Sequence, residues 1–245
     1  GVVWNAADFG LQAQSREADL TPENDYKGFA KFVDANDVGI RDRIDHVLDR
    51  IKLMGAIRKI ALYGEWCGVG VQPVKKSKGA AVAKFDPKHW ALFAVAALID
   101  GIRDPINVTH MVLDTLPADS FIGNVSQAGT WTITVDFSDP ASIEAAQTEA
   151  ARITAMVEAQ CPYGKIYGLE GAGEGVVWMP TGEFQGREDL FWKHKTEAHS
   201  VVFEPKLSKD RPVVADDVQA MVAEFVACTV TPNRLEQGID VLEQH

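Results

Sequence analysis

The chain has 245 residues, 46% of them hydrophobic and 24% charged, as in a typical soluble globular protein. Its 24 basic and 35 acidic residues give a net charge of −11, which argues against a protein that coats nucleic acid without regard to sequence. No apolar run is long enough to span a bilayer, no signal peptide is visible, and the three scattered cysteines form no disulfide framework. We therefore expect a cytoplasmic protein without contact to a membrane.

Hydrophobic patterning predicts helices inserted among strands in the first part of the chain. Ile40, Ile44 and Val47 share one helical face, and Gly55 follows them as a stop signal. The segment that starts at Thr21 has the composition of a helix start, with Thr as the N-cap, Pro next and acids in the first turn. In chain order, the predicted elements are strands at 2–4 and 11–15, helices at 21–33 and 37–54, and strands at 57–66, 81–85 and 90–98.

Residues 129–137 alternate apolar and polar side chains, which is the period of a half-buried strand. The segment 138–142 is typical of a helix cap, and the helix that it starts should run to about Gln160. A glycine-rich turn and a strand follow within 167–178. The remaining predicted elements are strands at 190–195 and 200–204 and helices at 216–228 and 231–243.

This irregular mixture of strands and helices favours an α+β fold over a doubly wound sheet. Polar residues and a proline between Lys206 and Pro212 mark a boundary. We therefore expect a main domain over 1–205 and a helical C-terminal element over 206–245. The last segment, 213–245, is acidic, with six acids and one arginine.

Lys193 and Lys195 alternate on a predicted strand, so both side chains lie on one face of it. Glu174 begins a second strand, Glu174-Gly-Val-Val-Trp178. A carboxylate strand near a double-lysine strand suits a metal-assisted nucleotide site, because the metal takes the carboxylate and the phosphates take the ammonium groups. A Lys-x-Lys strand alone is more often a solvated face.

A second segment of interest is the apolar strand that ends at Gly64, Glu65 and two further glycines. Gly64 has no side chain, so a ligand can approach the backbone there, and Glu65 would stand at the end of the strand. An ordinary surface turn explains the same pattern.

Three motifs occur in this order: Tyr-Gly-Glu-Trp-Cys-Gly-x-Gly-x-Gln at 63–72, Gly-Glu-Gly-Val-Val-Trp at 173–178 and Phe-Trp-Lys-His-Lys at 191–195. Together they resemble the motifs of the ATP-dependent RNA ligases, in particular the phage and editing-type enzymes. The resemblance covers residues 1 to about 205. It implies an antiparallel-sheet nucleotidyltransferase core, like that of an ATP-grasp ligase, with inserted helices. It also implies RNA repair, in which a lysine attacks ATP, the AMP passes to an RNA 5′-phosphate, and a 3′-hydroxyl closes the break.

The resemblance assigns a role to each matching residue. Arg16 would contact the sugar or phosphate of the nucleotide, and Phe93 would stack on the adenine. Glu65 would bind the ribose or a metal-bound water, and Glu174 would lie beside the metal, Mg²⁺ or Mn²⁺. The pair Lys193 and Lys195 would grip the phosphate. Two alternatives stay open: Phe93 as an ordinary core residue, and Arg16 as a surface ion pair.

The nucleophilic lysine of that family, in a Lys-x-Asp-Gly-like motif before the first hairpin strand, has no counterpart in this chain. Lys31 does not match, because no glycine follows it and it lies on a predicted helix. If the first strand is at 2–4, the lysine would lie just before Gly1, and without it no lysyl-AMP can form.

The expected partners are RNA ends, nicked or single-stranded, with no obligate protein partner evident; a phage-encoded protein would act in the host cytoplasm. The alternative function is a non-catalytic module that binds a nucleotide or an RNA end. A third, weaker one is a related covalent nucleotidyltransferase, such as a DNA ligase or a capping enzyme.

Overall fold

The computed structural model describes residues 1–71 and 79–195. The chain divides into two compact units, Gly1–Ser200 and Val201–His245, and all described residues belong to the first unit. The predicted boundary after residue 205, the strand at 200–204 and the two C-terminal helices lie outside the described residues.

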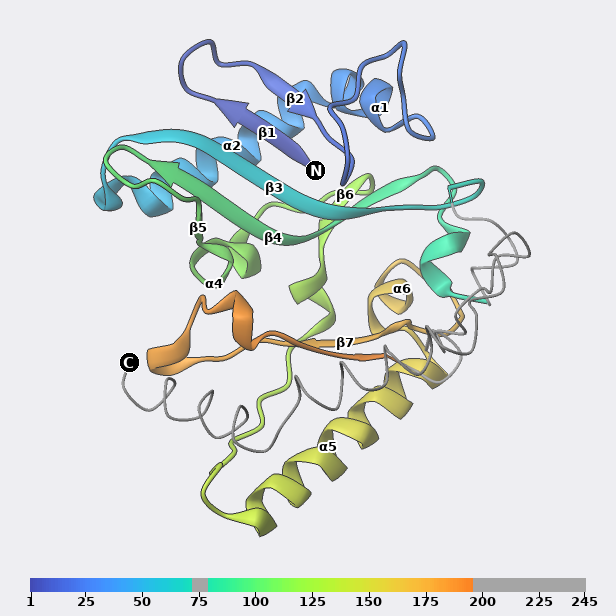
Figure 1. Ribbon diagram of the computed structural model, residues 1–245. Helices are drawn as coiled ribbons and strands as arrows, with labels where there is room; N and C mark the ends of the chain where they lie inside the picture. The colour runs from blue at the N-terminus through green and yellow to red at the C-terminus, as the bar shows by residue number, and fades with distance from the viewer. Residues whose placement is uncertain (72–78, 196–245) are drawn as a thin grey trace, which may run out of the picture. The chain divides into compact units, whose positions relative to one another are not determined.

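The main sheet has six strands and is antiparallel except for one pair (Figure 1). Its strand order is β2-β1-β3-β4-β5, and β6 pairs with β4 in parallel. The strands are β1 (Val2–Asn5), β2 (Leu11–Ala13), β3 (Ile57–Cys67), β4 (His89–Ile99), β5 (Ile106–Asn107) and β6 (Ile122–Asn124). The fold of the described part is therefore α+β with mostly antiparallel pairing, as the sequence predicted.

A second, two-stranded sheet is formed by β7 (Gly175–Trp178) and β8 (Trp192–Lys195). The helices are α1 (Phe29–Ala35), α2 (Asp37–Ile51), α4 (Thr109–Val112), α5 (Pro140–Ala159) and α6 (Pro162–Ile166). Short 3₁₀ helices are η1 (Lys52–Met54), η2 (Ala81–Lys84), η3 (Leu113–Thr115), η4 (Val125–Ala128), η5 (Gly182–Phe184) and η6 (Glu188–Leu190). None of these described helices is long and apolar enough to cross a bilayer.

The core lies between one face of the main sheet and helices α1 and α2. Leu62 of β3 and Leu92 of β4 are fully buried there, together with Ile44 and Val47 of α2. Burial of one such side chain contributes roughly 1.5–3 kcal/mol, so this face fixes the positions of β3 and β4.

The opposite face of the main sheet is only partly covered. Cys67 and Ala91 on this face pack against Cys161 and Tyr163 at α6. In Figure 1, β7 and β8 lie between this face of the main sheet and α5. Of the side chains of β3 and β4 on this face, those of Tyr63, Glu65 and Phe93 are exposed.

Most predicted elements are present, with shifted ends. The hairpin of β1 and β2, helix α2, strands β3, β4, β7 and β8, and helix α5 all occur within a few residues of their predicted bounds. Asp139 caps α5 through a 3.0 Å hydrogen bond from the Ala141 amide, and Gly55, at φ 125°, ends the helical segment of α2 and η1. These elements carry the strongest local signals in the sequence.

The predicted helix start at Thr21 is wrong. Helix α1 begins only at Phe29, after Gly28 in the left-handed region at φ 88°. The hydroxyl of Thr21 accepts a hydrogen bond from the Asn24 amide at 3.1 Å, so it closes a loop turn instead of capping a helix. The side chain of Asp25 contacts the amino-terminal end of α1 instead: its carboxylate accepts a 2.7 Å hydrogen bond from the Ala30 amide.

Two predicted strands are also wrong. Residues 81–84 form the 3₁₀ helix η2, where the Ala83 amide donates to the Ala80 carbonyl. Residues 129–137 pair with no strand in the described part of the chain. Trp131 and Ile133 are half-buried and Thr132 is exposed, so the predicted alternation of burial is present, but without a neighbouring strand it makes no sheet.

Candidate functional site

A cavity of about 850 Å³ opens beside the main sheet where β1 begins and β2 ends. It is bounded by Gly1, by the turn 14–17 that follows β2, by residues 63–66 of β3 and by Phe93 of β4. The remaining lining residues come from the approach to α1, from α1 itself and from the end of β3: Leu20, Tyr26, Phe29 and Val71. A volume of this size suits a small ligand such as a mononucleotide.

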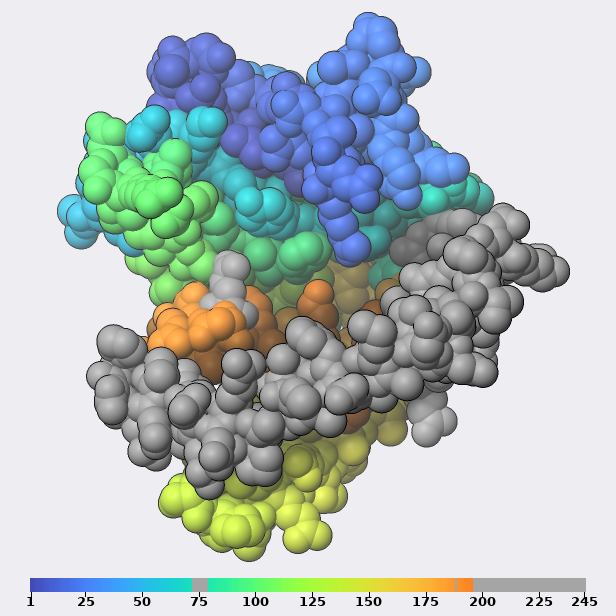
Figure 2. Space-filling model, viewed as in Figure 1, coloured from blue at the N-terminus to red at the C-terminus, as the bar shows by residue number. Residues whose placement is uncertain are grey.

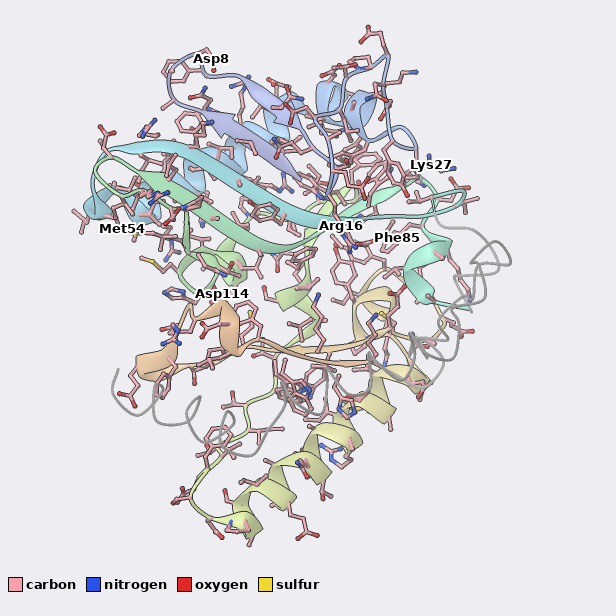
Figure 3. The ribbon with its side chains drawn as sticks, in the orientation of Figure 1. Asp8, Arg16, Lys27, Met54, Phe85 and Asp114 are labelled. Carbon is pink, nitrogen blue, oxygen red and sulfur yellow. The ribbon has the colours of Figure 1, made fainter. Side chains whose placement is uncertain are left out.

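Arg16 is presented to this cavity by a tight turn. The hydroxyl of Ser15 accepts hydrogen bonds from the amides of Glu17 at 3.2 Å and Ala18 at 3.0 Å, which fixes the turn around Arg16. Figure 3 shows Arg16 beside β3 and β4, and in Figure 2 the blue amino-terminal segment reaches down over the cyan and green atoms of the sheet. Arg16 is exposed and forms no ion pair within the described residues, so the surface ion pair is absent there.

Glu65 and Tyr63 lie on the same face of β3, because they are two residues apart on a strand. Both side chains are exposed, and both line the cavity. The ring of Tyr63 also lies against Gly1, with its Cδ1 3.3 Å from the point where a Cβ of Gly1 would be. The two-residue spacing of Tyr63 from Glu65 could have identified Tyr63 from the sequence, whereas no sequence signal pointed to Tyr26.

Gly64 lines the cavity, and the packing of β4 gives a further reason for glycine at this position. A Cβ at this position would overlap the indole nitrogen of Trp90 and would come 2.7 Å from the carbonyl oxygen of Ala91. Glycine is therefore required here by the packing of β4.

Phe93 lies in an irregularity of the β3–β4 ladder. Tyr63 pairs with Ala94 and Gly64 pairs with Leu92, so Phe93 is the extra residue of a β-bulge. Its side chain is 45% exposed and lines the cavity, so it is not a core residue. An aromatic ring held by the backbone at a cavity wall can stack on a planar base.

Lys193 and Lys195 lie on β8 of the second sheet, Glu174 directly precedes β7, and none of the three is among the residues that line the cavity. Lys193 pairs with Val177 and Lys195 with Gly175, and all three charged side chains are exposed. Neither lysine forms an ion pair with a described residue. The structure thus brings Arg16, Glu65 and Phe93 together, and places the other three on a neighbouring element.

The buried thiol of Cys67 links these two groups electrostatically. Burial raises the pKa of Cys67, and the carboxylates of Glu65 and Glu174 raise it further. A carboxylate of β3 and one that directly precedes β7 therefore both act on this thiol.

The described residues contain no group of three His, Cys, Asp or Glu side chains that could hold a metal ion. Mg²⁺ commonly binds through one or two carboxylates together with water and substrate phosphates. Glu65 and Glu174, both exposed, fit a metal that arrives with a nucleotide, and they do not fit a preformed metal centre.

The chain matches no protein-family model, and no curated protein is similar to it in sequence. A cation, a carboxylate and an aromatic ring from three separate segments line one cavity of suitable size.

Proposed function

We propose that this chain is the adenylylation domain of an ATP-dependent RNA ligase, with ATP bound in the 850 Å³ cavity. One observation carries the proposal: Arg16, Glu65 and Phe93, which are far apart in the sequence, line the same cavity. Adenylate recognition needs these three kinds of group, namely an aromatic face for the base, an acceptor for the ribose hydroxyls and a cation for the phosphate.

The start of β1 supports the proposed place of the nucleophile. Gly1 lines the cavity, and its nitrogen is held by a 2.8 Å hydrogen bond to the carbonyl of Gln14. A lysine just before Gly1 would therefore enter the same cavity as Arg16 and Glu65. Its amine nitrogen would attack the α-phosphorus of ATP, a P–N bond would form, and pyrophosphate would leave.

Two further steps complete the proposed reaction. A 5′-phosphate oxygen of RNA attacks the phosphorus of lysyl-AMP, which frees the lysine and forms an RNA-adenylate. The 3′-hydroxyl of the second RNA end then attacks the 5′-phosphorus, a phosphodiester bond forms, and AMP leaves. Lys193 and Lys195 would supply positive charge to the phosphates in all three steps, and Glu174 would hold a divalent cation whose charge would stabilise the pyrophosphate that leaves in the first step.

A non-catalytic module that binds a nucleotide or an RNA end is the second candidate. The observation that favours it is that no lysine is among the described residues that line the cavity. Such a module would use Phe93 and Arg16 in the same way, and it would bind ATP without any covalent step.

The two candidates differ in one experiment. Full-length protein is incubated with ATP labelled at the α-phosphate and with Mg²⁺ or Mn²⁺, and the product is denatured and separated. The ligase gives protein with acid-labile, covalently bound AMP, as expected for a P–N bond. ATP binding without covalent label under both metals would refute the ligase and support the binding module.

A further inference from the structure

His89, at the first position of β4, is completely buried and has two hydrogen-bond partners. Its Nδ1 lies 3.1 Å from the Ser120 carbonyl oxygen, and its Nε2 lies 2.7 Å from the Tyr163 hydroxyl. A carbonyl can only accept, so Nδ1 carries the hydrogen, and Nε2 accepts the hydrogen of Tyr163. The ring is also stacked on Phe85, with 4.4 Å between centroids and 12° between planes. Its position and tautomer are therefore fixed.

The His89–Tyr163 hydrogen bond connects the main sheet to the segment that leads to Glu174. On one side, His89 pairs with Cys67, two residues after Glu65 on β3. On the other side, Tyr163 lies in α6, directly after Cys161. The Cys161 amide donates to the Gly171 carbonyl at 2.8 Å, which ties α6 to the backbone just before Glu174.

Apolar contacts surround this hydrogen bond. Cys67 and Ala91 of the main sheet pack against Cys161 and Tyr163, and each of the four side chains is at most 7% exposed. Gly173, the residue before Glu174, donates its amide to the Val157 carbonyl of α5 at 2.9 Å. The contacts form a joint, defined here as His89 and Cys67 on one side and Cys161 and Tyr163 on the other.

We propose that His89 and Tyr163 are positioning residues that set the distance between Glu174 and the cavity residues Glu65 and Phe93. This inference depends on the proposed function, because it assumes that Glu174 acts on a nucleotide held by the main sheet. Neither His89 nor Tyr163 lines the cavity, so neither touches the nucleotide. Their effect is on geometry: a shift of about 1 Å between reacting groups can reduce a rate roughly 100-fold.

The kinetic test uses Tyr163→Phe, which removes the hydroxyl and keeps the ring. Its matched control is Tyr167→Phe, in the same aromatic cluster: the Tyr167 ring, which lies 4.7 Å from the His89 ring, is kept, and the hydroxyl that is removed lies 3.4 Å from Gln127 Oε1 and is not bonded to His89. In full-length protein, Tyr163→Phe should lower kcat of lysyl-AMP formation by roughly 10- to 100-fold with KM for ATP unchanged within about twofold. Tyr167→Phe should change neither. A raised KM with unchanged kcat in Tyr163→Phe would overturn the inference.

A second measurement needs no activity. Cys67 is 2% exposed and lies in the joint, so its alkylation by a thiol reagent, read from its peptide by mass spectrometry, reports opening of the joint. Tyr163→Phe should speed this alkylation about tenfold or more in folded protein, and Tyr167→Phe should not. Equal Cys67 alkylation in wild type and Tyr163→Phe would contradict the proposal.

If Tyr163→Phe does not fold, the hydrogen bond is tested from the other side with His89→Gln and His89→Leu. Gln keeps an acceptor for the Tyr163 hydroxyl, whereas Leu removes it. Slower alkylation of Cys67 in His89→Gln than in His89→Leu supports the joint, and equal rates overturn it. If wild-type protein forms no lysyl-AMP, the proposed function fails, whereas the alkylation rates still decide whether the joint exists.

Discussion

Glu65 and Phe93 line the same cavity although they come from two neighbouring strands, β3 and β4, and both side chains are on the sheet face that points away from the main core. On β4, Phe93 follows Ala91 by two residues, so the alternation of side chains places both on the face opposite Trp90 and Leu92 of the main core. The shared face thus brings an aromatic ring and a carboxylate to the same cavity, which is the pairing that adenosine recognition uses.

Replacement of Phe93 should weaken ATP binding with little effect on the fold. Phe93→Ala is expected to raise the Kd of ATP by roughly 3- to 10-fold, because an aromatic stacking contact is worth about 0.5–1.5 kcal/mol. The ring is 45% exposed, so the thermal midpoint should change little. Isothermal titration measures the affinity. The control is Phe121→Ala, where the ring is 42% exposed and lies outside the cavity lining, and an equal loss in both variants would refute the stacking role.

Loss of Lys193 or Glu174 should stop adenylylation while the protein stays folded. Lys193→Ala and Glu174→Ala are each expected to lower the rate of lysyl-AMP formation by about 100-fold or more, since they remove charge that acts on the phosphates or the metal. Both side chains are exposed, so circular dichroism and melting should match the wild type. Lys31→Ala, an exposed lysine on α1, is the control. Wild-type labelling in both site variants would exclude these assignments.

Gly64 should tolerate no side chain. Gly64→Ala is expected to destabilise the fold by about 1–3 kcal/mol, because the new methyl group would overlap the Trp90 indole and force β3 and β4 apart. Chemical denaturation measures the change. Gly39→Ala on α2 is the control, since its Cβ would be 3.4 Å from Arg43 Nη1 and glycine within a helix is unfavourable. A Gly64→Ala protein as stable as the wild type would show that the space is open after all.

Stability should fall in mild acid because of His89. Burial lowers the pKa of His89 below its ordinary value of 6.5; the Ser120 carbonyl and Asp119 oppose this shift, and Arg43 adds to it. Below about pH 6.5 the unfolded chain therefore takes up a proton that the folded chain does not, and stability is full above that pH and decreases below it.

Titration of His89 alone should change the free energy of unfolding by at most about 1.4 kcal/mol per pH unit. Urea denaturation at pH 7.5 and pH 5.5 measures it, and His89→Gln should show a smaller difference between the two pH values. The carboxyl of Asp119 does not interfere, because hydrogen bonds from the Ile122 and Phe121 amides and from Arg43 outweigh its burial and lower its pKa below 3.8. An unchanged slope in His89→Gln would show that the pH response has another source.

Strong local periodicity explains why much of the fold could be predicted. Helix α2 and strands β3 and β4 have long apolar patterns, and the structure confirms them. Residues 129–137 have an equally clear alternation, but no described strand lies beside them to complete a ladder. A strand depends on a partner strand that its own sequence does not contain. The segment that starts at Thr21 is a similar case: Thr21 accepts a hydrogen bond within a loop turn, and the residue types around it are the same as those of a helix cap.

The candidate site was predictable to a different degree for each residue. Glu65 stood out because a strand ends there among glycines, whereas Arg16 and Phe93 were found only through the resemblance to RNA ligases. The joint of His89 and Tyr163 could not be predicted, since it depends on a contact between residues 74 positions apart. Burial of a histidine in that contact is a property of the tertiary structure alone.

The most direct test of the account is a chase of lysyl-AMP with RNA. Full-length protein is labelled with ATP, freed of nucleotide, and mixed with an RNA that has a 5′-phosphate and a neighbouring 3′-hydroxyl. The account predicts that label leaves a lysine just before Gly1, passes through RNA-adenylate, and ends as free AMP with one joined RNA formed for each AMP released. Absence of lysyl-AMP, or labelled protein that keeps its AMP in the presence of this RNA, would contradict it.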